Sequence, residues 1–312
     1  MRRSFVAVLL LGLGTGIVTP GPAEAAPSRL QPCSEAWALV AGESSGLAQN
    51  DLSAWARVND GFLSMSDATF DGPLSNAFGD VSAAAEVVTI TLQSDTAEDP
   101  SHADFDASLG ALGTVCAQLT VTQHKERVAR FQRFSYQTGV VTGLAPAASS
   151  AATAAVASLV KPAVADGRKA TGPACIGDAK RCGYFVETLK QRRCVPGLVC
   201  VNQQVGILAV GANSGMAWVN TLALDSRTGQ PVPLSTIVPA SATPAFLVRL
   251  NAEVKKVLAK GGIVNDPFFP TNLKLSDVQA WLPQPDGIHV WFAKYAVAPG
   301  SFGIVHVVVP AA

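Results

Sequence analysis

The spacing of apolar residues changes near residue 120, and this change constrains the fold more than any other feature of the chain. Up to that point apolar residues recur at steps of three and four, the period of amphipathic helices, in stripes that begin at Leu52, Leu74 and Phe105. Beyond it, short runs rich in aromatic and β-branched residues are typical of strands. We therefore expect an α+β protein with a helical unit first and a mixed unit second.

The helical unit is expected to span residues 33–120 and to form a small four-helix bundle. A short first helix places Cys33, Trp37 and Val40 on one face, and Cys116 lies on the buried stripe of the last helix. We predict a Cys33–Cys116 disulfide that ties the first helix to the last. Apolar stripes of this kind usually form a core, so the pattern assigns this unit no chemistry.

The mixed unit is expected to span residues 128–312. An Ala-rich helix that begins at Pro146 is predicted to end before Pro162, because proline lacks the backbone N–H that a helix interior needs. A second amphipathic helix is predicted over 244–258. We interpret the charged segment around His124 as a linker. The predicted strands are 130–141, 184–190, 198–210, 218–224, 288–295 and 304–309, of which the last two form a closing hairpin.

Six cysteines favour three disulfides in an exported chain, although 15 connectivities are possible. Pro196 and Gly197 suit a type II turn that two cysteines flank symmetrically, so a bridge across this turn is geometrically easy. No cysteine has a histidine close enough in sequence to suggest zinc, so we expect no metal site. The preferred pairs are Cys33–Cys116, Cys175–Cys182 and Cys194–Cys200.

Residues 1–25 have the three regions of a secretory signal peptide. Arg2 and Arg3 supply positive charge, residues 5–18 form an apolar segment, and a small-residue cleavage site ends at Ala25. The apolar segment is shorter than the roughly 20 residues that cross a bilayer. We therefore expect a secreted protein without a membrane span, held at most loosely at the cell envelope.

The net charge of the whole chain is zero because an acidic first part and a basic second part cancel. Residues 26–120 carry 2 basic against 13 acidic side chains, a net charge of −11, and residues 121–312 carry 19 against 9, a net charge of +10. Such a division favours two units with different surfaces, which attract each other or attract different partners. The alternative is a drift in surface composition without functional meaning.

Two segments of the basic unit resemble a known family. Residues 224–234 (LDSRTGQPVPL) resemble its strand-and-turn motif, and residues 295–310 (YAVAPGSFGIVHVVVP) resemble its closing hairpin. The family is the RsiV-like domain, shared by the extracellular sensor part of some anti-sigma factors and by secreted mycobacterial immunogenic proteins. The resemblance covers roughly residues 130–312. It implies a curved antiparallel sheet with helices on one face, and recognition of other molecules in place of known catalysis.

This chain departs from the family pattern in one loop and in its architecture. Asn213 stands where family members commonly have a histidine, so a role for that histidine does not carry over. The anti-sigma members also have a cytoplasmic segment and a membrane span. We expect neither here, and therefore no direct control of a sigma factor.

The sequence favours binding over an enzymatic function. Residues 42–46 (GESSG) match the nucleophile elbow of α/β hydrolases, which would make Ser44 the nucleophile, but that elbow follows a strand and here a helix is predicted. His289 and His306 lie on predicted strands. For each of them a surface position, a core position and a role as catalytic base stay open. Our interpretation is a secreted, non-enzymatic recognition protein. The alternatives are a secreted esterase-type hydrolase, which would turn over short-chain esters, and a structural envelope protein with no discrete ligand.

Basic residues gather around the first strands and the disulfide loops of the second unit. A constrained, basic surface suits an anionic envelope polymer, anionic lipid or an acidic protein. The alternative is that these charges are solvated and only balance the acidic unit. We expect no cofactor and no nucleic-acid partner. The candidate binding residues are Arg130, Arg133, Arg192 and Arg193, with Asn213 and Tyr295 from the family motifs.

Overall fold

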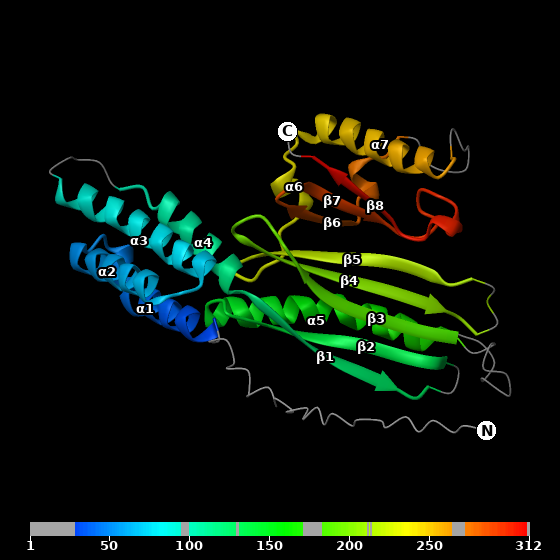
Figure 1. Ribbon diagram of the computed structural model, residues 1–312, viewed down its shortest axis with the longest axis horizontal. Helices are drawn as coiled ribbons and strands as arrows, with labels where there is room; N and C mark the ends of the chain where they lie inside the picture. Colours follow the sequence, from blue (N-terminus) through cyan, green and yellow to red (C-terminus); the bar gives the residue numbers. More distant parts are fainter. Residues whose placement is uncertain are drawn as a thin grey trace, which may run out of the picture.

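The computed structural model describes residues 29–94, 100–128, 131–170, 183–210, 212, 214–263 and 272–310. A helical bundle lies at one end of an elongated molecule, and a large sheet and a small sheet follow it (Figure 1). This arrangement confirms the predicted α+β class. The predicted signal peptide over 1–25, the pair Cys175 and Cys182, Arg130 and Asn213 all lie outside the described residues.

The first unit is a bundle of four helices, as predicted. Its core includes the fully buried rings of Trp55, Phe62 and Phe78. The predicted Cys33–Cys116 disulfide is present and joins the first helix to the end of the last. The helices are α1 (Leu30–Ala48), α2 (Leu52–Ala68), α3 (Gly72–Gln93) and α4 (Ala103–Cys116).

A five-stranded sheet in the order β1-β2-β3-β4-β5 forms the centre of the second unit. Neighbouring strands are antiparallel except for β2 and β3, which are parallel and are connected by a helix that covers one face. The segment around His124 is strand β1, so the predicted linker is wrong there. The strands are β1 (Gln118–Glu126), β2 (Phe131–Thr142), β3 (Gly183–Arg192), β4 (Leu198–Leu208) and β5 (Met216–Asp225).

Helix α5 (Pro146–Lys169) covers this sheet and continues past Pro162, so the predicted end of the helix is wrong. Val156, Val160 and Val164 form one buried stripe against the sheet, and burial of that stripe on both sides of the proline offsets the lost backbone hydrogen bond. Among the described helices, α5 alone is long and apolar enough to cross a membrane by length and composition. In this fold it contacts β2, β3, β4 and β5 as a core helix does.

A second, three-stranded sheet lies beyond β5 (Figure 1). Helix α7 packs on β8 and buries Phe246, Leu250 and Val254. The sheet is joined to β5 by the Trp281 N–H, which donates to Thr221 Oγ1 at 2.8 Å. Its elements are α6 (Leu234–Ile237), α7 (Thr243–Lys260), β6 (Ala280–Gln284), β7 (Gly287–Phe292) and β8 (Val305–Val309), with 3-10 turns at Leu275–Asp277 and Gly300–Phe302.

The acidic and basic units pack directly against each other. Trp37 Nε1 on α1 donates to the Gly143 carbonyl after β2 at 2.8 Å. The buried Ser226 hydroxyl after β5 donates to the Gly110 carbonyl of α4 at 2.7 Å. The next residue, Arg227, forms an ion pair with Asp106 of the same helix at 2.9 Å. Opposite charges therefore meet at the junction of the two units.

A carboxylate lies buried inside the large sheet. Glu187 on β3 accepts hydrogen bonds from the Gln137 backbone N–H at 2.6 Å and from Gln203 Nε2 at 3.2 Å. Gln203 in turn accepts a hydrogen bond from Asn220 Nδ2 at 2.7 Å. Desolvation raises the pKa of Glu187 above its ordinary value, against the two hydrogen bonds that favour the charged form.

The raised pKa of Glu187 predicts a pH-dependent contribution to stability. Because the folded state binds this proton more tightly than the unfolded state, the stabilisation is complete below the unfolded pKa and is lost as pH rises through the folded pKa. Urea unfolding should therefore show Glu187→Gln gaining stability relative to wild type from about pH 4 to about pH 7. In the matched control Glu126→Gln the trend should reverse and should lie below about pH 5, because the hydrogen bond from Arg168 lowers the pKa of Glu126, so that wild type loses the stabilisation from this ion pair as pH falls. A difference between Glu187→Gln and wild type that does not change with pH would contradict this assignment.

Candidate functional site

A cleft of about 940 Å³ lies between the helical bundle and the end of the large sheet. Helices α3 and α4 form one wall, and the turn between β3 and β4 forms the other. The side chains that matter for its chemistry are Asp80 and Thr114 on the helices, Arg192 and Arg193 at the end of β3, and Pro196 on the turn. The cleft therefore combines a helical wall that carries a carboxylate and a hydroxyl with a basic wall.

The sequence determines the turn locally. Leu198 N–H donates to the Val195 carbonyl at 3.3 Å, and Gly197 has a φ of +85°, which is the position where a type II turn requires glycine. The predicted Cys194–Cys200 disulfide closes the segment. The turn chemistry and this bridge are therefore confirmed.

Neighbouring elements hold the turn on three sides. The Ser226 N–H donates to the Gly197 carbonyl at 2.9 Å, and the Val195 N–H donates to the Pro283 carbonyl of β6 at 3.2 Å. The Gln191 side chain, on the strand that leads into the turn, donates at 2.9 Å to the carbonyl of Ala117, between α4 and β1. Side chains on this turn are therefore presented on an anchored backbone.

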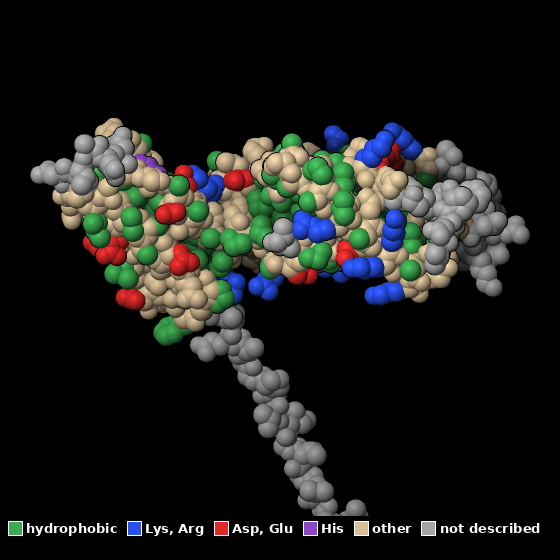
Figure 2. All heavy atoms as spheres, turned by 90° about the horizontal axis from the view of Figure 1, so that it is seen from above, with side chains coloured by type: hydrophobic (Ala, Val, Ile, Leu, Met, Phe, Trp, Pro, Cys, Tyr) green, Lys and Arg blue, Asp and Glu red, His purple; other side chains and the backbone are tan. Residues whose placement is uncertain are grey.

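Arg192 and Arg193 are exposed at the rim of the cleft. Within the described part of the chain, neither guanidinium has an acidic partner within 4 Å, whereas Arg57, Arg168 and Arg227 each form an ion pair. On the face seen in Figure 2, acidic side chains gather over the bundle and Lys and Arg side chains over the sheets. An unpaired guanidinium offers a planar fork of donors that matches carboxylate and phosphate groups.

The remaining candidates lie at the opposite end of the sheet. Arg133 on β2 pairs with Tyr184, and Tyr184 pairs with Leu208, whereas Arg192 pairs with Cys200. The eight positions between Cys200 and Leu208 separate these ends by about 26 Å. The structure therefore brings Arg192 and Arg193 together and does not place Arg133 beside them.

Tyr295 also lies toward the Arg133 end, after β7. Its φ of 71° turns the backbone, and its hydroxyl lies 3.2 Å from Ser214 Oγ. Lys294 Nζ lies 5.0 Å from the centre of the ring and donates to the Gly215 carbonyl at 2.7 Å. The hydrogen bond with Ser214, and then the Lys294 charge, lower the pKa of the Tyr295 hydroxyl. Ser214 therefore contacts Tyr295, and Asn213 itself lies outside the described residues.

The two strand histidines meet on the small sheet. His289 Nδ1 lies 3.0 Å from His306 Nε2, and His289 Nε2 lies 2.8 Å from Asp286 Oδ1. The Trp291 ring stacks on His306 at 4.7 Å, and this partial burial, then the charges of His289 and Arg192, lower the pKa of His306. Sequence reasoning missed Asp286, which the Pro285-Asp286-Gly287 turn signal between two strands indicates.

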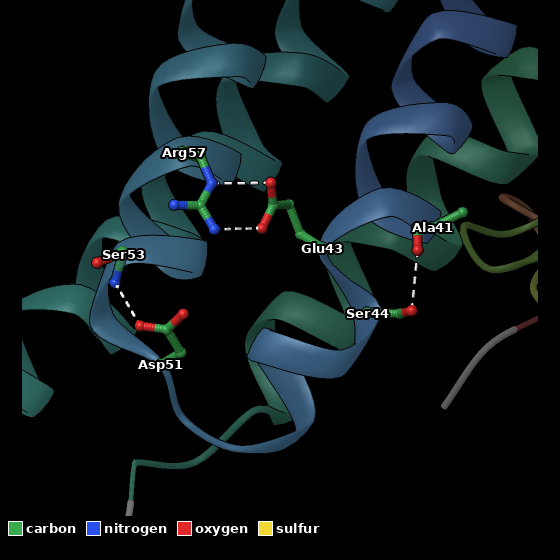
Figure 3. A network of polar contacts seen from close by, with 6 residues as sticks. All are labelled: Ala41, Glu43, Ser44, Asp51, Ser53 and Arg57. Carbon is green, nitrogen blue, oxygen red and sulfur yellow. Dashed lines mark hydrogen bonds and ion pairs between the residues drawn. The ribbon is translucent and has the colours of Figure 1, made fainter.

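Ser44 lies inside helix α1. Its hydroxyl donates to the Ala41 carbonyl one turn earlier at 2.8 Å, and the neighbouring Glu43 forms a two-point ion pair with Arg57 at 2.8 and 2.7 Å (Figure 3). A nucleophile elbow needs a strand before the serine and a helix after it. The 42–46 motif is therefore part of a continuous helix and does not form that elbow.

The C-terminal part of the chain matches a described family. Residues 242–312, which include α7 and the three-stranded sheet, match the model of a "Protein of unknown function (DUF3298)". No curated protein matches the chain. Two solved structures are similar to it, each at 14% identity and over 62% of this chain. One is a DUF3298 family member from Bacteroides fragilis (TM-score 0.42, 90% of that chain), and the other a DUF3298 family protein from Pseudomonas aeruginosa (TM-score 0.44, 89% of that chain).

Proposed function

We propose that this chain is an exported, non-enzymatic recognition protein that binds an anionic envelope polymer, or an acidic protein surface, through Arg192 and Arg193. The observation that carries this proposal is the pair of exposed guanidinium groups at the rim of the cleft, which have no acidic partner among the described residues. Arg192 ends strand β3 and Arg193 follows it, directly before a turn that is anchored by the Cys194–Cys200 disulfide and by hydrogen bonds to two other elements. Less side-chain and loop freedom is lost on binding when the backbone is already fixed.

Export to an oxidising compartment is supported by the disulfides. Two bridges join the described cysteines, and such bonds persist mainly outside the cytoplasm. The signal peptide over residues 1–25 remains the proposed route, with a place in the extracellular space or loosely at the envelope. The RsiV-like assignment is likewise a proposal, supported by the order of α7, β7 and β8 within the matched segment.

Binding is favoured over ester hydrolysis by the position of the only proposed nucleophile. Ser44 is on α1 of the bundle, and its hydroxyl is committed to the Ala41 carbonyl. His289 and His306 are on strands of the small sheet, and their hydrogen bonds join them to each other and to Asp286. Turnover of short-chain esters by the purified mature protein, lost in Ser44→Ala, would instead support the hydrolase.

The proposed binding is tested by titrating polyphosphate and polyglutamate, as phosphate and carboxylate probes, into the mature protein. The double variant Arg192→Ala/Arg193→Ala should bind the preferred polymer at least about tenfold more weakly, because two charge-assisted contacts are lost. Affinity of wild type should also fall steeply between low and high salt. Arg57→Ala is the matched control and should bind as wild type does, since Arg57 is paired with Glu43 away from the cleft. Affinity that is independent of salt, or unchanged in the double variant, would contradict the proposal.

A further inference from the structure

The cluster on the small sheet consists of two imidazoles and one carboxylate in a fixed order. Asp286 is held in the tight β6–β7 turn, His289 on β7 and His306 on β8. Trp291 on β7 is directly opposite His306 on β8. His289, two residues before Trp291 on the same face, is therefore the diagonal neighbour of His306. The backbone of two paired strands therefore brings the two rings together, without a contribution from any loop but the turn that holds Asp286.

One nitrogen of each ring points at the other. His289 Nδ1 and His306 Nε2 are 3.0 Å apart, so between neutral rings one of these nitrogens carries the proton of the hydrogen bond and the other accepts it with its lone pair. A divalent transition metal that bonds two imidazoles at about 2.0–2.1 Å each holds the nitrogens about 3 Å apart when the two bonds are at right angles, as in tetragonal Cu²⁺, and about 3.4 Å apart when they are tetrahedral, as in Zn²⁺. The observed separation of 3.0 Å matches the first geometry, and the second needs the rings to move apart by roughly 0.4 Å.

The second nitrogen of His289 is occupied in the way that metal-binding histidines usually require. His289 Nε2 lies 2.8 Å from Asp286 Oδ1, and Asp286 is mostly exposed. A carboxylate that accepts the N–H of a ligating imidazole fixes the ring orientation and the tautomer, and makes the other nitrogen a better donor. Asp286 therefore orients Nδ1 of His289 toward His306.

We propose that His289 Nδ1 and His306 Nε2 together bind one borderline divalent transition metal ion, such as Zn²⁺ or Cu²⁺, while the proton that His306 Nε2 carries in the hydrogen bond moves to His306 Nδ1, so that both rings stay neutral. Asp286 is the positioning residue. Among the described residues no group of three or more His, Cys, Asp or Glu converges as metal ligands, so water or an external ligand completes the coordination. His306 is exposed, which leaves room for those ligands. This site does not rest on the proposed function of Arg192 and Arg193.

The environment of the pair determines which metals fit. Imidazole nitrogen suits zinc, copper and nickel, and does not suit magnesium or calcium, which take oxygen ligands. The charge of Arg192 acts on His306 and opposes a cation, whereas the carboxylate of Asp286 favours one. One face of His306 is covered by the Trp291 ring, which holds the imidazole plane in place.

The test is isothermal titration of the metal-free mature protein with Zn²⁺ and Cu²⁺, with Mg²⁺ as the hard-cation control. Wild type should bind one Zn²⁺ or Cu²⁺ and no Mg²⁺. His289→Ala and His306→Ala should each weaken that binding at least about tenfold, and Asp286→Asn should weaken it by about tenfold. Near-UV circular dichroism verifies that each variant is folded.

His124→Ala is the matched control, because His124 is also an exposed strand histidine but its Nε2 contacts Thr138 Oγ1. It should bind the metal as wild type does. Absence of a one-to-one Zn²⁺ or Cu²⁺ site in wild type would overturn the proposal, whatever the variants do. A site that persists in both folded histidine variants would also overturn it.

Discussion

A variant in which Cys33 and Cys116 are both serine is expected to lose about 4 kcal/mol of free energy of unfolding. The bridge spans 83 positions and closes almost the whole bundle into one loop. In the chain-entropy description, a longer closed loop removes more freedom from the unfolded chain and therefore stabilises the folded state more. Both cysteines are also buried in the apolar core of the bundle, where serine hydroxyls would lack hydrogen-bond partners.

The second described bridge provides the control for this prediction. Cys194 and Cys200 are 6 positions apart, so replacing both with serine should cost only about 2 kcal/mol. Urea unfolding of the two double variants under one set of conditions measures the difference. A smaller loss for the Cys33 and Cys116 variant than for the Cys194 and Cys200 variant would contradict the loop-length explanation.

Phe185→Ala is expected to lower the free energy of unfolding by about 4 kcal/mol. The Phe185 ring is fully buried between β3 and α5 and stacks on Phe134 with ring centres 4.7 Å apart. Helix α5 approaches it so closely that a Cβ atom on Gly167 would lie 2.4 Å from the ring. Removing the ring therefore leaves a cavity that the helix and sheet fill only in part.

Phe70→Ala is the matched control for that substitution. Phe70 follows α2 and its side chain is fully exposed, so the same chemical change should alter the free energy of unfolding by less than about 0.5 kcal/mol. Thermal or urea unfolding of both variants gives the comparison. Equal losses for Phe185→Ala and Phe70→Ala would mean that α5 does not pack on the sheet as described.

Elements with one buried face were predictable from the sequence. The stripes of α2, α3 and α4 repeat at the helical period because each helix has one face in the bundle core. The β3–β4 turn was predictable because Pro196 and Gly197 restrict the backbone locally. In both cases the signal is contained in a few neighbouring residues.

Elements that lack such a signal were missed. Strand β1 is an edge strand with no buried side chain in its length, so no alternation marks it. Strand β6 has only five residues and contains Pro283, which argues against a strand in sequence terms. Helix α5 continues through Pro162 because the sheet that stabilises it is assembled from strands far away in sequence.

The candidate site depended on strand register, which the sequence does not specify. Arg133 and Arg192 both lie near strand ends, and only the pairing of β2, β3 and β4 places them at opposite ends of the sheet. The same limit applies to His289 and His306. Their approach to 3.0 Å requires the β7–β8 register.

The place of the binding surface is tested most directly by comparing the two ends of the sheet in one titration. Polyphosphate or polyglutamate, whichever binds wild type more tightly, is titrated at low salt into the Arg192→Ala/Arg193→Ala variant and into Arg133→Ala. Arg133 is exposed at the far end of the sheet. We expect the double variant to lose at least about tenfold in affinity and Arg133→Ala to lose less than about twofold. A larger loss in Arg133→Ala than in the double variant would contradict recognition at the cleft.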